Sequence, residues 1–278
     1  MAKILDGKSL AKSIREKVKI QVQGMGFSPG LAVIIVGNNP ASRVYVDNKK
    51  KDCIACGITS KEYALPDNIG EGKLLSLIHE LNSAADIHGI LVQLPLPEGY
   101  NVQKIIQTIS PDKDVDAFHM QNVGRILNGD YSFLPCTPAG VVEILDYYGI
   151  ETIGRHCVVV GHSNIVGKPM AIMLLHRHAT VTICHIHTQD LASFTRQADI
   201  LVCAVGKVNL ITADMVKPGA VVIDIGINPK EGGGIVGDVD FDAVSQVASY
   251  ITPVPGGVGP MTRAMLMLNT VNAAQKMV

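Results

Sequence analysis

A predicted helix over residues 41–56 carries three side chains that together could move protons. Ser42, Tyr45 and Lys49 follow one another at helical intervals, which places them on one face. A lysine directed into a partly desolvated cleft releases its proton more readily, because burial disfavours the charged form, and it can then transfer protons near neutral pH. The alternative is a solvated helix on which Lys49–Lys51 are surface charges.

Two further segments place polar groups where a ligand could reach them. Gln93 ends a predicted buried strand over 89–93, and ligands of open parallel sheets collect at the carboxyl ends of strands. Asp116 closes the segment 113–116, Lys-Asp-Val-Asp. Its carboxylate can accept two parallel N–H bonds from an amino-pyrimidinone edge. The alternative for each acid of this segment is a solvated loop charge or a turn former.

A turn between a strand and a helix, over residues 158–169, favours a dinucleotide site. Gly161 permits close backbone approach at the strand end, and Ser163 offers a small hydroxyl. Unpaired amides at the helix start, together with the helix dipole, would hold a pyrophosphate. The spacing departs from GxGxxG, because Ser163 replaces the second glycine and Gly167 follows late, so an ordinary strand-to-helix turn is the alternative.

The next strand end argues for NADP rather than NAD. An NAD site usually places Asp or Glu about 20 residues after the first turn, where the acid binds the ribose 2′-hydroxyl. Residues 184–188 read Cys-His-Ile-His-Thr and contain no carboxylate. We therefore expect a 2′-phosphate to be tolerated, with His162, His187 and Thr188 as possible donors.

Composition excludes several classes of protein. The 278 residues include 24 basic and 25 acidic side chains, so the net charge of -1 removes the electrostatic argument for nucleic-acid or anionic-membrane binding. The longest apolar runs are strand-sized, and residues 1–19 lack the apolar core of a signal peptide. Six cysteines without framework spacing indicate a reducing compartment. We expect a soluble, cytoplasmic protein.

Short apolar runs alternate with amphipathic helices, a pattern typical of α/β proteins with a mainly parallel sheet. In the first half, helices are predicted over 5–22, 41–56 and 70–82, and strands over 31–36, 58–65 and 89–93. In the second half, strands are predicted over 157–160, 180–185, 200–204, 221–225 and 250–253.

Residues 110–135 show no sustained periodicity of apolar residues. A long stretch of this kind inside a compact chain is usually functional or a hinge. A helix follows, with Thr137 as N-cap and Pro138 in its first turn. We therefore place the boundary between the two domains here. We expect residues 1–136, together with a last helix over about 262–278, to form one domain, and 137–261 to form a Rossmann-like, doubly wound dinucleotide domain. Alternatively, the last helix caps the second domain.

Two patterns that resemble metal or redox sites are discounted. Cys53-Ile-Ala-Cys56 is a lone CxxC that falls late on a helix, with no second pair to complete a zinc site. His176, His178, His185 and His187 straddle a helix end and a strand with no acid or cysteine pair beside them. No metal is expected.

Taken together, these segments resemble the bifunctional methylenetetrahydrofolate dehydrogenase/methenyltetrahydrofolate cyclohydrolase family over nearly the whole chain. The resemblance implies a substrate domain and a Rossmann domain separated by a cleft, in a homodimer that uses NADP and a tetrahydrofolate. It is carried by six collinear motifs: Tyr45-Val-x-x-Lys49-x-Lys51, Gln93-Leu-Pro-Leu-Pro97, Lys113-Asp-Val-Asp116, Pro135-Cys-Thr-Pro138, Gly161-x-Ser163-x-x-Val-Gly167-x-Pro169 and Pro253-Val-Pro-Gly-Gly-Val-Gly-Pro-Met-Thr262.

The resemblance also implies roles for the matching residues. Lys49 is the main catalytic residue of the cyclohydrolase step and is tuned by Gln93, while Tyr45 lies against the folate rings and Asp116 holds the pterin edge. The implied folate contacts are Ser42, Tyr45, Val92, Gln93, Leu94, Asp116, Pro255, Gly256 and Gly259. The implied dinucleotide contacts are Gly161, His162, Ser163, His187, Thr188 and Ile227.

Three positions depart from the family's usual residues: Ala117 replaces Gly, His162 replaces Arg, and Ile186-His187 replaces Ser with a basic residue. We expect oxidation of 5,10-methylenetetrahydrofolate to the methenyl form and its hydrolysis to 10-formyltetrahydrofolate. The alternatives are a monofunctional dehydrogenase, against which Lys49 and Gln93 argue, and a catalytically silent dinucleotide-sensing protein, which would need only the second domain.

Overall fold

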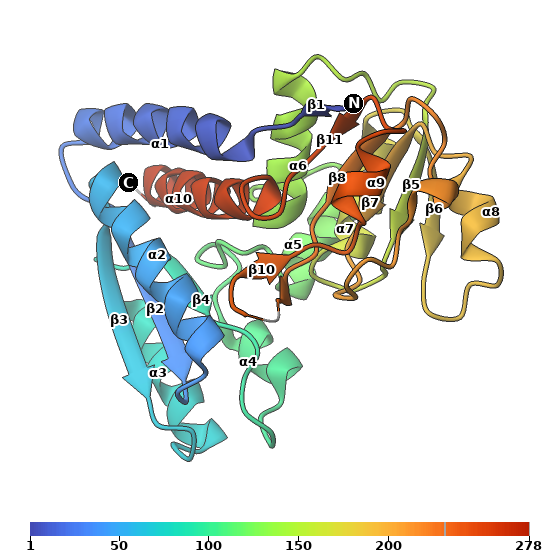
Figure 1. Ribbon diagram of the computed structural model, residues 1–278. Coiled ribbons are helices and arrows are strands. Elements are labelled where there is room, and N and C mark those ends of the chain that lie inside the picture. Colours follow the sequence, from blue (N-terminus) through green and yellow to red (C-terminus); the bar gives the residue numbers. More distant parts are fainter. Residues whose placement is uncertain (231, 278) are drawn as a thin grey trace. The chain divides into compact units, whose positions relative to one another are not determined.

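A computed structural model describes residues 1–230 and 232–277 (Figure 1). The chain divides into two compact units, one of Met1–Ala11 with Thr137–Thr262 and one of Lys12–Cys136 with Arg263–Val278. We call them the six-stranded unit and the three-stranded unit after their main sheets. Both sheets are parallel, as the sequence predicts. In the described part of the chain, no helix is long and apolar enough to cross a bilayer.

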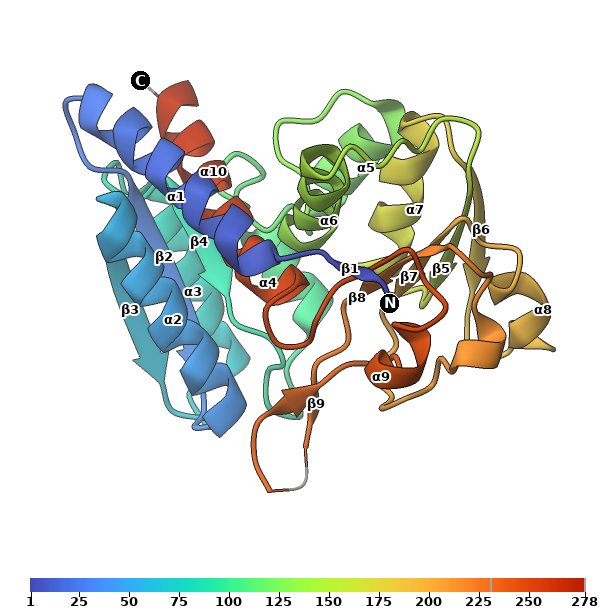
Figure 2. The ribbon, with the colours of Figure 1, turned by 45° about the horizontal axis from the view of Figure 1, so that its top comes forward.

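The three-stranded unit has β2 at its centre, and every residue of this strand is buried, as expected where both faces of a parallel sheet are covered. On one face, Leu74, Ile78 and Ile105 of α3 and α4 join the apolar cluster. Helix α2 covers the other face (Figure 2). The elements are α1 (Gly7–Gly24), β2 (Gly30–Val36), α2 (Pro40–Cys56), β3 (Thr59–Leu65), α3 (Glu71–Ser83), β4 (Gly89–Val92), α4 (Val102–Thr108), α5 (Met120–Asn128) and α10 (Val258–Lys276). The first residues of α1, up to Ala11, and of α10, up to Thr262, belong to the six-stranded unit.

Asp52 of α2 connects two other helices of this unit. Its carboxylate oxygens lie 3.4 Å from Nε of Arg15 on α1 and 3.2 Å from a guanidinium nitrogen of Arg263 on α10. The two helices run side by side in both ribbon views (Figures 1 and 2). Because Asp52 is buried, these ion pairs compensate the loss of its hydration.

The last helix is also tied to the three-stranded unit by a buried amide. Nδ2 of Asn269 donates to the carbonyl oxygens of Val115 at 2.8 Å and Leu134 at 3.0 Å. Buried backbone acceptors need such partners, since an unpaired polar group inside a protein costs about 1–3 kcal/mol. The residues from Arg263 onward therefore pack with the first part of the chain.

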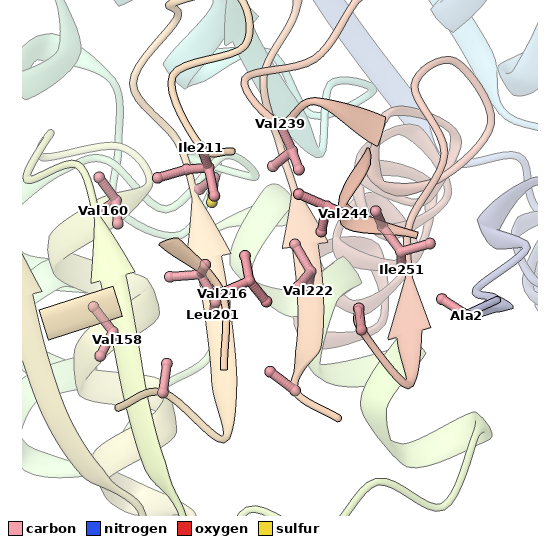
Figure 3. Close-up of a cluster of buried hydrophobic side chains, with 14 of the residues drawn as sticks. Ala2, Val158, Val160, Leu201, Ile211, Val216, Val222, Val239, Val244 and Ile251 are labelled. Atoms are coloured by element: carbon pink, nitrogen blue, oxygen red, sulfur yellow. The ribbon is translucent and has the colours of Figure 1, made fainter. Parts of the chain in front are cut away.

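The six-stranded unit has the strand order β1-β11-β8-β7-β5-β6. Val158, Leu201 and Val222 come from its three central strands and meet in one apolar cluster (Figure 3). The elements are β1 (Lys3–Ile4), α6 (Cys136–Tyr147), β5 (His156–Val160), α7 (Gly167–His176), β6 (Thr180–Cys184), α8 (Leu191–Thr195), β7 (Ile200–Cys203), a 3-10 turn (Ala213–Met215), β8 (Val221–Asp224), the hairpin β9 (Asn228–Pro229) and β10 (Ile235–Val236), α9 (Phe241–Val244) and β11 (Tyr250–Ile251).

The start of the chain belongs to the six-stranded unit, so the expected domain 1–136 is wrong for Met1–Ala11. Strand β1 pairs in parallel with β11. Ala2 is buried in the apolar cluster of this unit, and the N–H of Leu5 donates to the carbonyl of Ile251 at 2.9 Å. A strand of two residues is too short to leave a periodic pattern in the sequence.

The stretch 110–135, expected to be irregular, contains helix α5. His119 caps its start by accepting the N–H of Gln121 on Nδ1, and Gly129 ends it with a φ of 78°. Only Asn122 and Ile126 of this helix are buried, and the apolar Met120, Val123 and Leu127 are exposed. Helix α6 begins at Cys136, so Thr137 is not its N-cap as expected.

Candidate functional site

Lys49 leaves α2 toward the end of β4, where its Nζ donates to Oε1 of Gln93 at 2.9 Å. Gln93 donates its own Nε2 to the carbonyl of Leu94 at 2.7 Å, which turns the amide oxygen toward the lysine. The surface-charge alternative fits the neighbouring Lys50, whose side chain is 53% exposed, but not Lys49. The structure therefore brings together the lysine and the amide that the sequence pairs by resemblance.

The surroundings of Lys49 lower its pKa, and the largest cause is burial. Burial lowers the pKa of Lys49, and the positive charge of Arg263 lowers it further, whereas the negative charge of Asp116 opposes the shift. Burial likewise raises the pKa of Asp116, and Lys49 opposes that shift. Burial also raises the pKa of the Tyr45 phenol, which therefore stays protonated. A partly buried amine beside a partly buried carboxyl and a protonated hydroxyl is suited to proton transfer.

Cys136 lies beside the same group of charges, and it behaves as a neutral side chain. Its Sγ lies 3.4 Å from the carbonyl oxygen of Val115 and receives the amide of Asn269 at 3.6 Å. Burial raises the pKa of the thiol well above its ordinary value. Because only the thiolate is a strong nucleophile, this cysteine is suited to packing and not to covalent chemistry.

The first two residues of the segment 113–116 have structural partners. Nζ of Lys113 donates to the carbonyl oxygens of Leu81 and Ala84, where α3 ends. Asp114 accepts the backbone N–H of His119 at 2.8 Å and the side-chain amide of Asn122 at 2.9 Å. These bonds fix the loop that presents Asp116.

The other predicted folate residues of this unit lie nearby. Val92, Leu94 and Asp116 line one small hollow. Ser42 is buried at the start of α2, where its N–H donates to Oδ1 of Asn39. Ala117, which follows Asp116, has a φ of 59°, so it occupies the left-handed region that favours glycine. The folate role of each of these residues stays a prediction.

Pro255, Gly256 and Gly259 belong to the six-stranded unit. Gly256 has a φ of 112°, and its carbonyl accepts the N–H of Lys8 at 2.9 Å. Gly259 lies in the first turn of α10. Their assignment to the folate likewise stays a prediction.

A pocket of about 740 Å³ opens in the six-stranded unit where β5, β6 and β7 end. Gly161 follows β5 with a φ of 119°, and a Cβ there would lie 2.2 Å from the carbonyl oxygen of Ala204, so only glycine fits. Gly161, His162, Ser163 and Thr188 line the pocket. Position and volume suit a dinucleotide, which parallel sheets bind at their carboxyl edge.

The turn after Gly161 supplies donors to this pocket. Oγ of Ser163 accepts the N–H groups of Val166 and Gly167, which shapes the start of α7. The backbone N–H groups of His162, Ser163 and Asn164 have no acceptor among the described residues, so they are available to a phosphate.

The sequence analysis did not assign several of the pocket residues to the dinucleotide site. Lys168, His185 and Lys207 line the pocket, and its described lining contains no aspartate or glutamate. A search for basic residues just beyond each predicted strand end would have found Lys207, which follows the predicted strand 200–204. Two expected contacts, His187 and Ile227, are not among the lining residues. Among the described residues, no group of three His, Cys, Asp or Glu side chains is placed to hold a metal.

Fold and site together define a two-domain α/β protein with a dinucleotide pocket in one unit and a desolvated lysine in the other. Residues 5–116 match the family described as tetrahydrofolate dehydrogenase/cyclohydrolase, catalytic domain, and residues 135–278 match its NAD(P)-binding domain. The chain belongs to this tetrahydrofolate dehydrogenase/cyclohydrolase family.

Individual relatives match this chain over nearly their whole length. The bifunctional protein FolD of Acetivibrio thermocellus is 57% identical, with 99% of this chain and 97% of that protein covered. The crystal structure of the bifunctional FolD enzyme from Campylobacter jejuni is 52% identical, covers 100% of both chains and has a TM-score of 0.98. A Trypanosoma brucei dehydrogenase-cyclohydrolase, solved with an NADP cofactor and inhibitor, is 37% identical, with a TM-score of 0.95 and 99% and 98% of the two chains covered.

The buried Asp114 should make the stability of the protein depend on pH. Burial raises the pKa of Asp114 from its ordinary 3.8 to about 6. Because the folded-state pKa exceeds the unfolded one, the stability contributed by the neutral form is present below about pH 4 and is lost as the pH rises through 6. Relative to wild type, we expect Asp114→Asn to gain about 2 kcal/mol in unfolding free energy between pH 4 and pH 7.

Urea unfolding at both pH values measures this difference. Asp112→Asn, which changes an exposed acid of the same loop, is the control. If the difference between Asp114→Asn and wild type is the same at pH 4 and pH 7, Asp114 does not titrate as described.

Proposed function

We propose that this chain oxidises 5,10-methylenetetrahydrofolate to 5,10-methenyltetrahydrofolate with NADP as hydride acceptor, and hydrolyses the product to 10-formyltetrahydrofolate. As a family member with full-length bifunctional relatives, it is an enzyme of one-carbon folate metabolism. The observation that carries the assignment of the second step to named residues is the partly buried hydrogen bond between Lys49 and Gln93.

The hydride step asks little of the side chains beyond binding and orientation. A bound nicotinamide supplies the electron sink for the hydride that leaves the methylene carbon. The pocket residues would hold this cofactor through the backbone amides after Gly161 and through Lys168 and Lys207, whose positive charges would attract its phosphates. No proton has to move in this step, so it does not require Lys49.

The hydrolysis step requires proton transfer. The methenyl group is an amidinium-like cation. The attacking water loses one proton as it adds to the carbon and its second as the formyl carbonyl forms. The ring nitrogen that leaves gains one proton, and the other is released to solvent. Lys49, whose pKa is lowered by burial, accepts the proton of the attacking water and returns one to the leaving nitrogen. Gln93 holds the amine in place, Asp116 accepts N–H groups of the pterin edge, and Tyr45 lies against its ring.

The two activities should separate by mutation. We expect Lys49→Ala to lower methenyl hydrolysis at least about 100-fold, the usual contribution of a proton-transfer group, and to lower hydride transfer far less. The loss of methenyltetrahydrofolate absorbance measures hydrolysis, and the appearance of reduced cofactor measures hydride transfer. Lys50→Ala, which removes an exposed lysine from the same helix, should change neither. An equal loss of both activities in a folded Lys49→Ala protein would contradict this role.

The preference for NADP is supported by the chemistry of the pocket. Its described lining carries two lysines and two histidines but no acid that could bind a free ribose 2′-hydroxyl. We expect the ratio kcat/KM at pH 7 to be higher for NADP than for NAD, with saturating methylenetetrahydrofolate. A strong preference for NAD would refute this part of the proposal.

We also propose an oligomeric state and a cellular location for the chain. We expect a homodimer, so light scattering should give twice the mass of the chain. The mass of a single chain would refute this prediction.

A cytoplasmic location is supported by the six free, buried cysteines, which suit a reducing compartment.

A further inference from the structure

We propose that Arg263 of α10, held by Asp52 of α2, acts on the hydrolysis step through Lys49 and not by contact with the substrate. This inference rests on the proposed function, since it concerns the step in which Lys49 transfers protons. The motif over 253–262 that carries the family resemblance ends one residue before Arg263. Arg263 is a positioning residue, and all three side chains belong to the three-stranded unit.

Arg263 lies against the face of α2 that carries Lys49. Tyr45, Lys49 and Asp52 follow one another at helical intervals, so they share one face. One turn beyond Lys49, a guanidinium nitrogen of Arg263 lies 3.2 Å from Oδ2 of Asp52. This oxygen has no hydrogen bond in the described part of the chain, so it depends on the ion pair. Burial raises the pKa of Tyr45, and the charge of Arg263 opposes this rise, so the guanidinium is near Tyr45 as well.

A second residue of α10 supports this placement. Nδ2 of Asn269 donates to the carbonyl oxygen of Val115 at 2.8 Å and lies 3.6 Å from Sγ of Cys136. Asp116, the residue after Val115, is the acid that opposes the lowering of the Lys49 pKa by burial. Helix α10 therefore contacts both α2 and the segment that presents Asp116.

The ion-pair group that includes Arg263 carries a net positive charge. Asp52 also pairs with Arg15 of α1, whose Nε lies 3.4 Å from Oδ1. Arginine stays protonated at every physiological pH, so two guanidinium groups share one carboxylate. The single negative charge balances only one of them, and one positive charge remains at this face of α2.

The groups that surround Lys49 differ in the direction of their effect. Burial lowers the pKa of Lys49, and the charge of Arg263 adds to the lowering, because it repels the ammonium form. Asp116 acts in the opposite direction. Cys53 and Cys136 stay neutral, because burial raises the pKa of each thiol. Arg263 is therefore the side chain whose charge favours the neutral amine, the form that accepts a proton.

Loss of this charge should slow hydrolysis near neutral pH, because a smaller share of Lys49 would be neutral. A more basic amine would recover part of the loss, since it takes up a proton more readily. At pH 7 we expect kcat for methenyl hydrolysis to fall about two- to fivefold, a small part of the roughly 100-fold contribution of a proton-transfer group. Hydride transfer should be unchanged.

The test compares Arg263→Gln with two matched variants. Glutamine keeps an N–H donor for Oδ2 of Asp52 but lacks the charge. Arg263→Lys keeps the charge and should keep the wild-type rate and pH profile. Arg15→Gln removes the other guanidinium from the same carboxylate. It should also keep the wild-type profile, because the charges that act most strongly on Lys49 do not include Arg15.

Two readouts distinguish an effect on Lys49 from a purely structural one. The first is kcat and KM for methenyl hydrolysis from neutral to mildly alkaline pH, corrected for the uncatalysed reaction. Arg263→Gln should lower kcat at pH 7, leave KM unchanged and approach the wild-type rate as the pH rises. The second is the titration midpoint of the Lys49 ε-carbon resonance in protein with ¹³C-labelled lysine. This midpoint should rise in Arg263→Gln and stay at the wild-type value in Arg15→Gln.

An unchanged Lys49 midpoint in Arg263→Gln would overturn the inference, and so would an equal rise in Arg15→Gln. A higher KM with an unchanged kcat would also overturn it, because Arg263 would then contact the substrate. If the wild type hydrolyses no methenyltetrahydrofolate, the proposed function itself fails. If the wild type hydrolyses it and Arg263→Gln keeps the same pH profile, only this inference fails.

Discussion

The ammonium of Lys49 lies away from water, and this sets the main constraint on the three-stranded unit. An amine in this position loses hydration free energy that the protein must compensate, or the amine loses its proton. The oxygen of Gln93, 2.9 Å away, and the charge of Asp116 supply partial compensation. The balance leaves a base that is weaker than an exposed lysine, as proton transfer near neutral pH requires.

Buried aspartates hold the loops around both candidate sites. Asp114 fixes the segment that presents Asp116. In the six-stranded unit, Asp238 accepts the N–H groups of Val205 and Gly206, in the loop after β7 that borders the dinucleotide pocket. Asp238 accepts several backbone N–H groups, and Asp114 accepts one backbone N–H and one side-chain amide, so each carboxylate helps to keep its loop in one conformation. The dinucleotide pocket and the proton-transfer site thus each depend on a loop that a buried aspartate fixes.

Much of this arrangement could be predicted from local sequence. Helix α2 has a periodic pattern and glycine at its end, so the common face of Tyr45 and Lys49 followed directly. Gly161 was identifiable because a strand, a glycine and a helix start occur in order. The parallel sheets followed from apolar runs of strand length.

The rest depends on contacts between segments far apart in the chain. Nothing near Arg263 indicates that its charge acts on Lys49, because α10 packs with elements more than 200 residues earlier. Helix α5 escaped detection because its nine residues are too few to show a sustained hydrophobic periodicity. The left-handed φ of Ala117 is imposed by the surrounding loop, since alanine has no local preference for it.

The central claim is that the Lys49 amine is desolvated, and an NMR titration of the protein with ¹³C-labelled lysine tests it directly. The Lys49→Arg variant, which lacks one ε-carbon resonance, assigns the signal. The account predicts a titration midpoint below the ordinary lysine pKa of 10.5, and a still lower one in Asp116→Asn, where the opposing negative charge is gone. A midpoint at or above 10.5 would place the ammonium in a water-like environment and contradict the account.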